Sequence, residues 1–291
     1  MNPKQMNGNH VNGTATKISI QGCEGSFHQV AAEQYFGKHV EVIPCATFKD
    51  VVNIASNTSE SDGGIMAIEN SIAGSILANY NLLRKSSLRV TGELTLKIDQ
   101  NLMVNPGVKL EDIHEVHSHP MAIQQCLKFL DNYNWKLVEA EDTASSARSI
   151  QHYKSKHIAA IASKLAAEMY QLEVIAPNIQ TLKNNYTRFL VVQSPEKAQE
   201  VKDANKASVS FHTDNSLGSL AKVLTKIADY GIKLAKLQSF TIATGDFTYG
   251  FHADIEFETV NQFNEMLESL KPLTEEIIVI GIYKKGITWE L

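Results

Sequence analysis

Short stretches typical of β-strands alternate with stretches of helical periodicity over the first part of this chain. Strand-like runs lie at 18–20, 40–43 and 64–68, and helices are expected to begin at Ser26 and Thr47. Such alternation is typical of parallel strands joined by helical crossovers. Near 91–104 the pattern changes to a longer strand-like tract, followed by further strands and helices. We therefore expect an α/β domain over 17–194 with two lobes, the second inserted in the first at about 94–175.

The segment after Ala176 is expected to return the chain to the first lobe. Two lobes connected in this way leave a cleft between them, which is a common location for small-ligand sites. The sequence therefore predicts a ligand site between the lobes.

A separate unit follows a charged segment at 195–206, which has no hydrophobic period and is expected to be a linker. A strand-like run at 207–211 precedes a helix whose apolar residues recur every three to four positions, at Leu217, Leu220, Leu224 and Ile227. Strands at 232–242 and 247–257 flank a turn at 244–246, and a helix at 260–270 leads to a last strand at 276–283. This βαββαβ order over 207–291 is that of a ferredoxin-like domain.

Charge and cysteine content disfavour several classes of protein. Lys and Arg number 27 against 32 Asp and Glu, without a long block of either sign, whereas nucleic-acid binding usually needs a basic footprint. No apolar stretch approaches the roughly 20 residues that span a bilayer. Residues 1–16 lack an export signal and are expected to be a frayed tail, and the cysteines Cys23, Cys45 and Cys126 lack CxxC spacing. We expect a cytoplasmic protein with reduced thiols that binds neither nucleic acid nor a membrane.

Four segments of the first domain place small polar residues at the expected start of a helix. They are 22–27 with Ser26, 69–75 with Glu69, Asn70 and Ser71, 118–120 with His119, and 142–144 with Thr143. Helix N-termini offer unpaired N–H groups and a partial positive charge, so several of them facing one cleft make an anion site. Taken singly, each residue has helix capping as its ordinary role.

The tripeptide Thr187-Arg188-Phe189 begins an apolar run and combines a hydroxyl, a permanent cation and an aromatic ring. Arg188 is the one basic residue in these segments, and its guanidinium suits a bidentate grip on a carboxylate. Phe189 is expected either near the ring of a substrate or in the core, where it would alternate with Val191.

In order, these segments resemble the motifs of the catalytic domain of prephenate dehydratases, and 207–291 resembles the ACT domain, a small regulatory module. The resemblance implies that prephenate, which carries two carboxylates, loses carbon dioxide and water to give phenylpyruvate in phenylalanine biosynthesis. No cofactor is implied. The resemblance makes Thr187 the central catalytic residue, which donates a hydrogen bond or relays a proton because a threonine hydroxyl is a poor acid at pH 7.

Glu69 and His119 are the two candidate proton sources, the first if burial raises its pKa and the second because imidazole titrates near neutrality. Ser26, Asn70, Ser71 and Thr143 are assigned to substrate binding together with Arg188 and Phe189. Three nearby histidines, His114, His117 and His119, also raise the possibility of zinc. No carboxylate or cysteine completes such a set nearby, so we expect no metal.

The C-terminal region is expected to bind an effector. Phenylalanine-sensing ACT domains typically read Glu-Ser-Arg-Pro where this chain has Gln238-Ser239-Phe240-Thr241, whereas the other sensing stretch survives in part as Leu217-Gly218-Ser219-Leu220. By analogy phenylalanine is the candidate effector, with Leu217, Gly218, Ser219, Leu220, Gln238 and Ser239 as its contacts, and the altered stretch leaves its inhibition of the enzyme an open question. ACT domains commonly pair across subunits, which implies a homodimer or homotetramer.

Two other functions remain open at this stage. Arogenate dehydratase differs in having an amine on its substrate where prephenate has a keto group, and an extra carboxylate partner for that amine would distinguish it. A non-catalytic protein that binds a small anion is the other alternative, because the two-lobed fold expected here, like that of periplasmic binding proteins, also suits ligand sensors.

Overall fold

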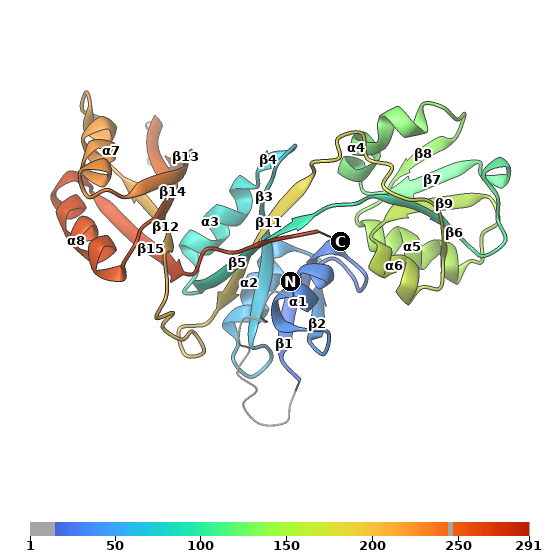
Figure 1. Ribbon diagram of the computed structural model, residues 1–291, viewed down its shortest axis with the longest axis horizontal. Coiled ribbons are helices and arrows are strands. Elements are labelled where there is room, and N and C mark those ends of the chain that lie inside the picture. Colours follow the sequence, from blue (N-terminus) through green and yellow to red (C-terminus); the bar gives the residue numbers. More distant parts are fainter. Residues whose placement is uncertain (1–14, 244–246, 291) are drawn as a thin grey trace.

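The computed structural model describes residues 15–243 and 247–290. Nearly all of the expected N-terminal tail and the whole of the expected turn at 244–246 lie outside the described residues. Within the described part, the first α/β lobe lies between the second α/β lobe and the C-terminal domain along the longest axis of the molecule (Figure 1).

The first lobe contains a seven-stranded sheet in which β1, β2 and β3 are parallel and β11 runs antiparallel between β3 and β5. Helix α1 (Phe27–Phe36) packs on one face, and α2 (Phe48–Ser56) and α3 (Leu77–Lys85) pack on the other. Both faces are covered, so the central strands are almost continuously apolar. The strands are β1 (Lys17–Gln21), β2 (Glu41–Cys45), β3 (Gly63–Asn70), β4 (Gly74–Ser75), β5 (Arg89–Lys97), β11 (Tyr186–Gln193) and β16 (Thr288–Trp289).

The second lobe has a five-stranded sheet of order β10-β6-β9-β7-β8, with β7 parallel to both β8 and β9. Its elements are β6 (Asn101–Val104), η1 (Leu110–Asp112), β7 (Glu115–Ser118), α4 (Pro120–Leu130), β8 (Lys136–Glu139), α5 (Thr143–His152), β9 (Ile158–Ala162), α6 (Lys164–Met169) and β10 (Glu173–Ala176). The expected start of this lobe at about 94 is wrong by a few residues, because β5 belongs to the first sheet up to Lys97.

The C-terminal domain has the expected βαββαβ order and a four-stranded antiparallel sheet of order β13-β14-β12-β15. Helices α7 and α8 cover one face of this sheet with an apolar core, and the other face meets the first lobe at α3 and β5. The elements are β12 (Lys206–His212), α7 (Ser219–Asp229), β13 (Lys233–Ala243), β14 (Phe247–Glu256), α8 (Val260–Leu270), η2 (Lys271–Leu273) and β15 (Glu276–Tyr283).

The end of the chain departs from the expected domain boundary at 291. After β15 it returns to the first lobe, where β16 pairs parallel with β5 through Thr288↔Thr95 and Trp289↔Leu96 (Figure 1). At Gly286 the two backbones approach so closely that a Cβ atom would lie 2.1 Å from the carbonyl oxygen of Glu93. Glycine meets this requirement because it has no side chain.

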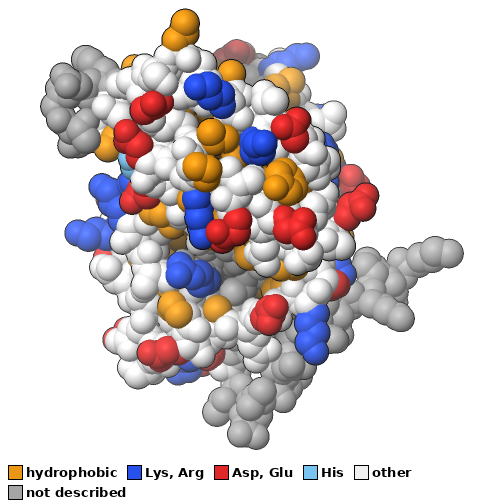
Figure 2. Space-filling model, turned by 90° about the vertical axis from the view of Figure 1, so that its left-hand side faces the viewer, with side chains coloured by type: hydrophobic (Ala, Val, Ile, Leu, Met, Phe, Trp, Pro, Cys, Tyr) orange, Lys and Arg blue, Asp and Glu red, His pale blue; other side chains and the backbone are white. Residues whose placement is uncertain are grey.

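The outer face of the C-terminal domain carries acidic and basic side chains interspersed with apolar ones (Figure 2). Charges of one sign do not gather on this face into the stripe that a nucleic-acid surface would need. Within the described residues, no helix has the length and apolar character that crossing a bilayer requires.

Candidate active site

The two lobes meet at the carboxyl ends of their parallel strands. In the first lobe β1 lies between β2 and β3, and in the second β7 lies between β8 and β9. Crossovers leave in opposite directions at such a point, which opens the crevice where α/β proteins bind ligands. Two hydrogen bonds join the lobes here, from Ser163 Oγ to the Gly25 carbonyl (2.5 Å) and from the Tyr170 hydroxyl to the Glu24 carbonyl (2.7 Å).

A third contact between the lobes joins Cys23 and Asp142, with the thiol donating to Oδ1 at 3.4 Å. Burial, together with the negative charge of Asp142, raises the pKa of the Cys23 thiol to about 12. Cys23 is therefore a neutral thiol at physiological pH and not an activated nucleophile.

Thr187 lies where β11 begins, opposite Asn70 at the end of β3 and Leu96 near the end of β5. Its side chain is 9% exposed, and Asn70 Nδ2 donates a hydrogen bond to its Oγ1 at 3.0 Å. The same amide nitrogen reaches Asn185 Oδ1 at 2.8 Å. Thr187 is thus held at the edge of the sheet that faces the second lobe.

The orientation of the Asn70 amide follows from its other partners. Its Oδ1 accepts hydrogen bonds from the backbone N–H groups of Ile72 (3.0 Å) and Ala73 (2.9 Å), so Nδ2 must be the end that reaches Thr187. An amide nitrogen only donates, and therefore the Thr187 oxygen acts as the acceptor in this bond. The hydroxyl hydrogen of Thr187 is left to point toward another group.

Asn185 extends this network into the second lobe, because its Nδ2 donates to Gln125 Oε1 on α4 at 2.9 Å. Sequence reasoning assigned no role to Asn185 or Gln125. The available signal was the Asn184-Asn185 pair, one residue before the tripeptide, since buried amides need partners and Asn185 is fully buried.

Several predicted binding residues are found at helix starts or beside β11. Ser26 caps α1 by accepting from Gln29 N, and it is buried. Ser71 accepts from the backbone N–H of Tyr186 and donates to the carbonyl of Asn184. Thr143 is half-buried at the first position of α5.

His119 follows β7 and caps α4, with Nδ1 accepting from Met121 N at 3.2 Å. The second ring nitrogen, Nε2, is not used by this cap. His119 caps the same helix whose Gln125 reaches Asn185, which in turn accepts from Asn70.

Arg188 is not where its predicted role requires it. Adjacent strand residues point to opposite faces of a sheet, and the guanidinium lies on the face of β11 opposite to the Thr187 side chain. It contacts Glu93 Oε2 (2.9 Å), Asp254 Oδ2 (2.5 Å), the Tyr80 hydroxyl (3.0 Å) and Glu69 Oε2 (3.4 Å). Its donors are occupied between the first lobe and the C-terminal domain, which corrects the expectation that Arg188 grips a substrate carboxylate.

Glu69 is displaced from its predicted role for the same reason. It pairs with Arg188 in the sheet register and therefore lies on the same face. Its carboxylate binds Lys236 Nζ of the C-terminal domain at 2.8 Å as well as Arg188. Glu69 is thus part of an interdomain ion pair and not positioned as a proton source beside Thr187.

Phe189 is buried in the core under α1, and its ring contacts the edge of the His28 ring at 5.1 Å between centroids. This position corresponds to the core alternative and corrects the assignment to substrate contact. His28, which the sequence analysis did not single out, lies beside it. Burial lowers the pKa of His28 to about 4.

The predicted effector residues fall into two groups in the C-terminal domain. Leu217 is fully exposed, and Gly218 adopts a left-handed φ of 81° at the start of α7. Ser219 donates to the Asp214 carbonyl, and Leu220 packs against the core. On β13, Gln238 is half-buried and Ser239 is exposed.

The histidines that suggested zinc have other contacts. His117 binds Glu115 at 2.9 Å, and the His114 ring stacks on that of His157. Within 15–243 and 247–290, no three His, Cys, Asp or Glu side chains are grouped in a way that could hold a metal ion.

Comparison with known proteins agrees with this architecture. The family model described as prephenate dehydratase matches residues 18–197. The bifunctional chorismate mutase/prephenate dehydratase of Enterobacter agglomerans is 32% identical over 286 residues, which cover 96% of this chain and 73% of that protein. The chloroplastic arogenate dehydratase/prephenate dehydratase 1 of Arabidopsis thaliana is 32% identical over 282 residues, with 92% and 71% covered.

Solved structures resemble the whole molecule. The prephenate dehydratase of Arthrobacter aurescens in complex with L-Phe has a TM-score of 0.83 at 25% identity, covering 92% of this chain and 90% of the other. A structure described as GqqA, a novel type of quorum quenching acylases, has a TM-score of 0.83 at 27% identity, with 92% and 98% covered. This chain therefore belongs to the prephenate dehydratase family.

Proposed function

We propose that this chain converts prephenate to phenylpyruvate, carbon dioxide and water at the junction of its two lobes, with Thr187 assisting departure of the ring hydroxyl. In this reaction the bond between the ring and its carboxylate breaks and releases carbon dioxide. The electron pair moves through the ring, which becomes aromatic, and the C–O bond to the hydroxyl breaks. One proton converts the departing hydroxide to water.

The hydrogen bond from Asn70 Nδ2 to Thr187 Oγ1 is the observation that supports this role. Because Asn70 can only donate there, the Thr187 hydroxyl has its own hydrogen available for the leaving oxygen. A donor held in place before the reaction stabilises charge that develops in the transition state. Thr187 is therefore a hydrogen-bond donor or a proton relay, and the proton comes from another group.

His119 is the better candidate for that group. Glu69, its alternative, is bound to Lys236 and Arg188 on the opposite face of the sheet. His119 belongs to the helix whose Gln125 reaches Asn185, and an imidazole ring can both donate and accept a proton. A folded His119→Gln enzyme should lose turnover, which steady-state kinetics with prephenate measure.

The two substrate carboxylates must be held without Arg188. The starts of α1, α4 and α5 all lie at carboxyl ends of strands where the lobes meet, and helix starts carry unpaired N–H groups. We assign Ser26, Ser71 and Thr143 to this anion site. Substrate affinity should therefore tolerate Arg188→Lys better than changes at the helix starts.

One assay determines whether the enzyme prefers prephenate or arogenate as its substrate. Purified protein is incubated with each compound, and formation of phenylpyruvate and of phenylalanine is followed. We expect phenylpyruvate from prephenate as the faster reaction. A higher kcat/KM with arogenate would assign the chain to the alternative that the name of the Arabidopsis relative includes.

Regulation and assembly are further parts of this proposal. L-phenylalanine is the proposed effector, supported by the Arthrobacter aurescens structure, which holds L-Phe. The C-terminal domain is proposed to be an ACT domain that pairs subunits into a homodimer or homotetramer. Titration with phenylalanine, with activity and thermal midpoint as readouts, tests the first point, and light scattering tests the second. Location in the cytoplasm stays a prediction from the sequence.

A further inference from the structure

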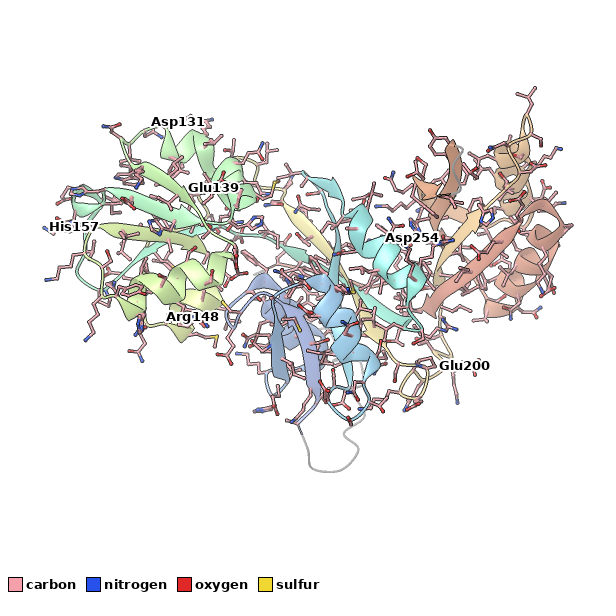
Figure 3. All side chains as sticks on the ribbon, turned by 180° about the vertical axis from the view of Figure 1, so that it is seen from behind. Asp131, Glu139, Arg148, His157, Glu200 and Asp254 are labelled. Atoms are coloured by element: carbon pink, nitrogen blue, oxygen red, sulfur yellow. The ribbon has the colours of Figure 1, made fainter. Side chains whose placement is uncertain are left out.

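Six charged side chains gather where the C-terminal domain meets the first lobe, and we call them the interdomain charge cluster. The first lobe contributes Glu69, Glu93 and Arg188, and the C-terminal domain contributes Lys206, Lys236 and Asp254. Asp254 lies on β14 between the C-terminal sheet and α3 (Figure 3). The cluster holds three cations and three carboxylates, so its charges balance only when the two domains are docked.

Arg188 is the centre of the cluster because its guanidinium contacts all three carboxylates. Lys206 Nζ binds Glu93 at 2.8 Å, and Lys236 Nζ binds Glu69 at 2.8 Å. Asp254 is held in turn by Ser208, whose hydroxyl donates to Oδ1 at 2.6 Å. Each carboxylate of the first lobe therefore has a lysine of its own, whereas the cation that Asp254 binds is Arg188.

Except for Glu69, whose side chain is 36% exposed, the cluster is largely buried. The Arg188 side chain is 12% exposed, and those of Glu93 and Asp254 are 5% and 3% exposed. Although burial alone would lower it, the nearby carboxylates, Asp254 foremost, raise the pKa of Arg188 well above its usual value. Charges in such surroundings are screened weakly, and one that loses its partner must move or remain unpaired.

Arg188 is also joined to Thr187 by a single peptide bond. The two side chains leave opposite faces of β11, so the cluster can act on the Thr187 hydroxyl only through the backbone of this strand. The pairing of β11 with β3 is irregular between Arg188 and Phe189, whereas its pairing with β5 is regular there. Asn70 holds the hydroxyl from one side of the sheet, and the cluster holds the backbone from the other.

We propose that Asp254 is a positioning residue for the dehydration: it binds Arg188 and thereby holds Thr187 at the geometry that the reaction needs. The proposal rests on the function proposed for Thr187. Asp254 does not contact the junction between the lobes. The C-terminal domain therefore influences turnover through Arg188, on the face of β11 opposite to Thr187.

The first test is Asp254→Asn, which keeps the shape of the side chain and removes its charge. Misplacement of a catalytic group by about 1 Å lowers turnover by up to roughly 100-fold, so we expect kcat to fall roughly 10- to 100-fold with KM nearly unchanged. Glu276→Gln is the matched control, because it breaks another interdomain ion pair, Arg84–Glu276 at 2.8 Å, without touching Arg188. Its kcat should stay within about twofold of the parent enzyme.

The second test replaces both partners, as Arg188→Met with Asp254→Leu. This variant keeps the Glu93–Lys206 and Glu69–Lys236 pairs, so the remaining charges stay balanced. Replacing a buried ion pair by apolar residues is often tolerated, whereas an unpaired charge is not. We expect the double variant to recover most of the turnover that Asp254→Asn loses. If Asp254→Asn does not fold, the kcat of the double variant tests the proposal instead.

Three results would overturn the proposal. One is a folded Asp254→Asn enzyme with parental kcat. Another is an equal loss in Glu276→Gln, which would indicate a general effect of domain docking. The third is a folded double variant as inactive as Thr187→Val, which would mean that Arg188 itself acts on the substrate. If Thr187→Val retains turnover, the function proposed for Thr187 fails separately from the role of Asp254.

Discussion

The junction between the two lobes and the interface with the C-terminal domain use opposite kinds of chemistry. Hydroxyls, carboxamides, backbone carbonyls and one thiol–carboxylate contact join the lobes, without an ion pair among these contacts, as in the Ser163–Gly25, Asn185–Gln125 and Cys23–Asp142 bonds. The C-terminal domain is joined by buried ion pairs centred on Arg188. Single neutral hydrogen bonds contribute about 1 kcal/mol each, whereas breaking a buried ion pair costs about 3 to 5 kcal/mol. The difference suggests that the lobes can adjust around a substrate while the C-terminal domain stays docked.

Strand β11 belongs to both interfaces. Thr187 and Arg188 are neighbours in the chain, yet one side chain lies in the neutral network and the other in the charged one. Four predictions test how far these two faces differ, in order of decreasing expected effect.

The largest effect is expected from Glu93→Gln. This change leaves Lys206 without its carboxylate and removes one of the three that Arg188 contacts. The free energy of unfolding should fall by about 3 to 5 kcal/mol, because both cations are buried. Denaturant unfolding measures it. Lys271→Met, which breaks an exposed pair with Glu268, is the control and should leave the midpoint unchanged; equal effects in the two variants would remove the distinction between the interfaces.

Thr187→Val should lower kcat by roughly 10²- to 10³-fold, or about 3 to 4 kcal/mol in the activation free energy, as loss of a transition-state hydrogen bond does. The stability should change little, since Asn70 Nδ2 keeps Asn185 Oδ1 as an acceptor. Steady-state kinetics with prephenate check this. Thr187→Ser retains the hydroxyl and should retain most of the turnover, and near-normal kcat in a folded valine variant would contradict the assigned role.

Acid should weaken the C-terminal interface through His252. This residue is 2% exposed, and neither ring nitrogen has a hydrogen-bond partner among the described residues. Burial, assisted by the charge of Arg84, lowers the pKa of His252 to about 4. The groups that face it are the rings of Tyr80 and Phe240 and the charged side chains of Arg84, Lys236 and Asp254.

The unfolded chain takes up this proton near pH 6.5, and the folded protein takes it up only near pH 4. The contribution of His252 to stability is therefore fully present above pH 6.5 and is lost as the pH falls from 6.5 to 4. The contribution amounts to roughly 3 kcal/mol, at about 1.4 kcal/mol per pH unit. His252→Phe should flatten the dependence measured by unfolding at several pH values. His28, whose pKa is also lowered to about 4, should leave a residual slope. An unchanged slope in the phenylalanine variant would show that His252 is not responsible.

The smallest effect is expected at the junction of the lobes. Ser163→Ala removes both the cap of α6 and the bond to the Gly25 carbonyl, and should lower the free energy of unfolding by about 1 to 2 kcal/mol. Thr259→Ala removes only a cap, that of α8, so the difference between the two variants estimates the bond between the lobes. If Ser163→Ala lowered the free energy of unfolding as much as Glu93→Gln, the two interfaces would not differ in strength.

The sequence predicted the elements better than the contacts between them. Alternating apolar patterns and capping residues located β1, α1 and α4, because these signals are local. The strand at Thr288–Trp289 gave no such signal, since two residues cannot show a period. Thr187 was recognised from its motif, but Asn185, which accepts from the same Asn70 amide, was not assigned, because a hydrogen bond across 115 residues follows from packing.

By itself, the chain determined that a two-lobed α/β domain precedes a βαββαβ domain, and that a hydroxyl, a guanidinium and a ring follow one another at the start of a strand. Periodicity and residue type carry that information. Only the tertiary structure decided which way each of the three points: Thr187 toward the other lobe, Arg188 toward the C-terminal domain and Phe189 into the core. Alternation along a strand places neighbouring side chains on opposite faces of the sheet. The tertiary structure determines which groups pack against each face, and therefore what each side chain can do.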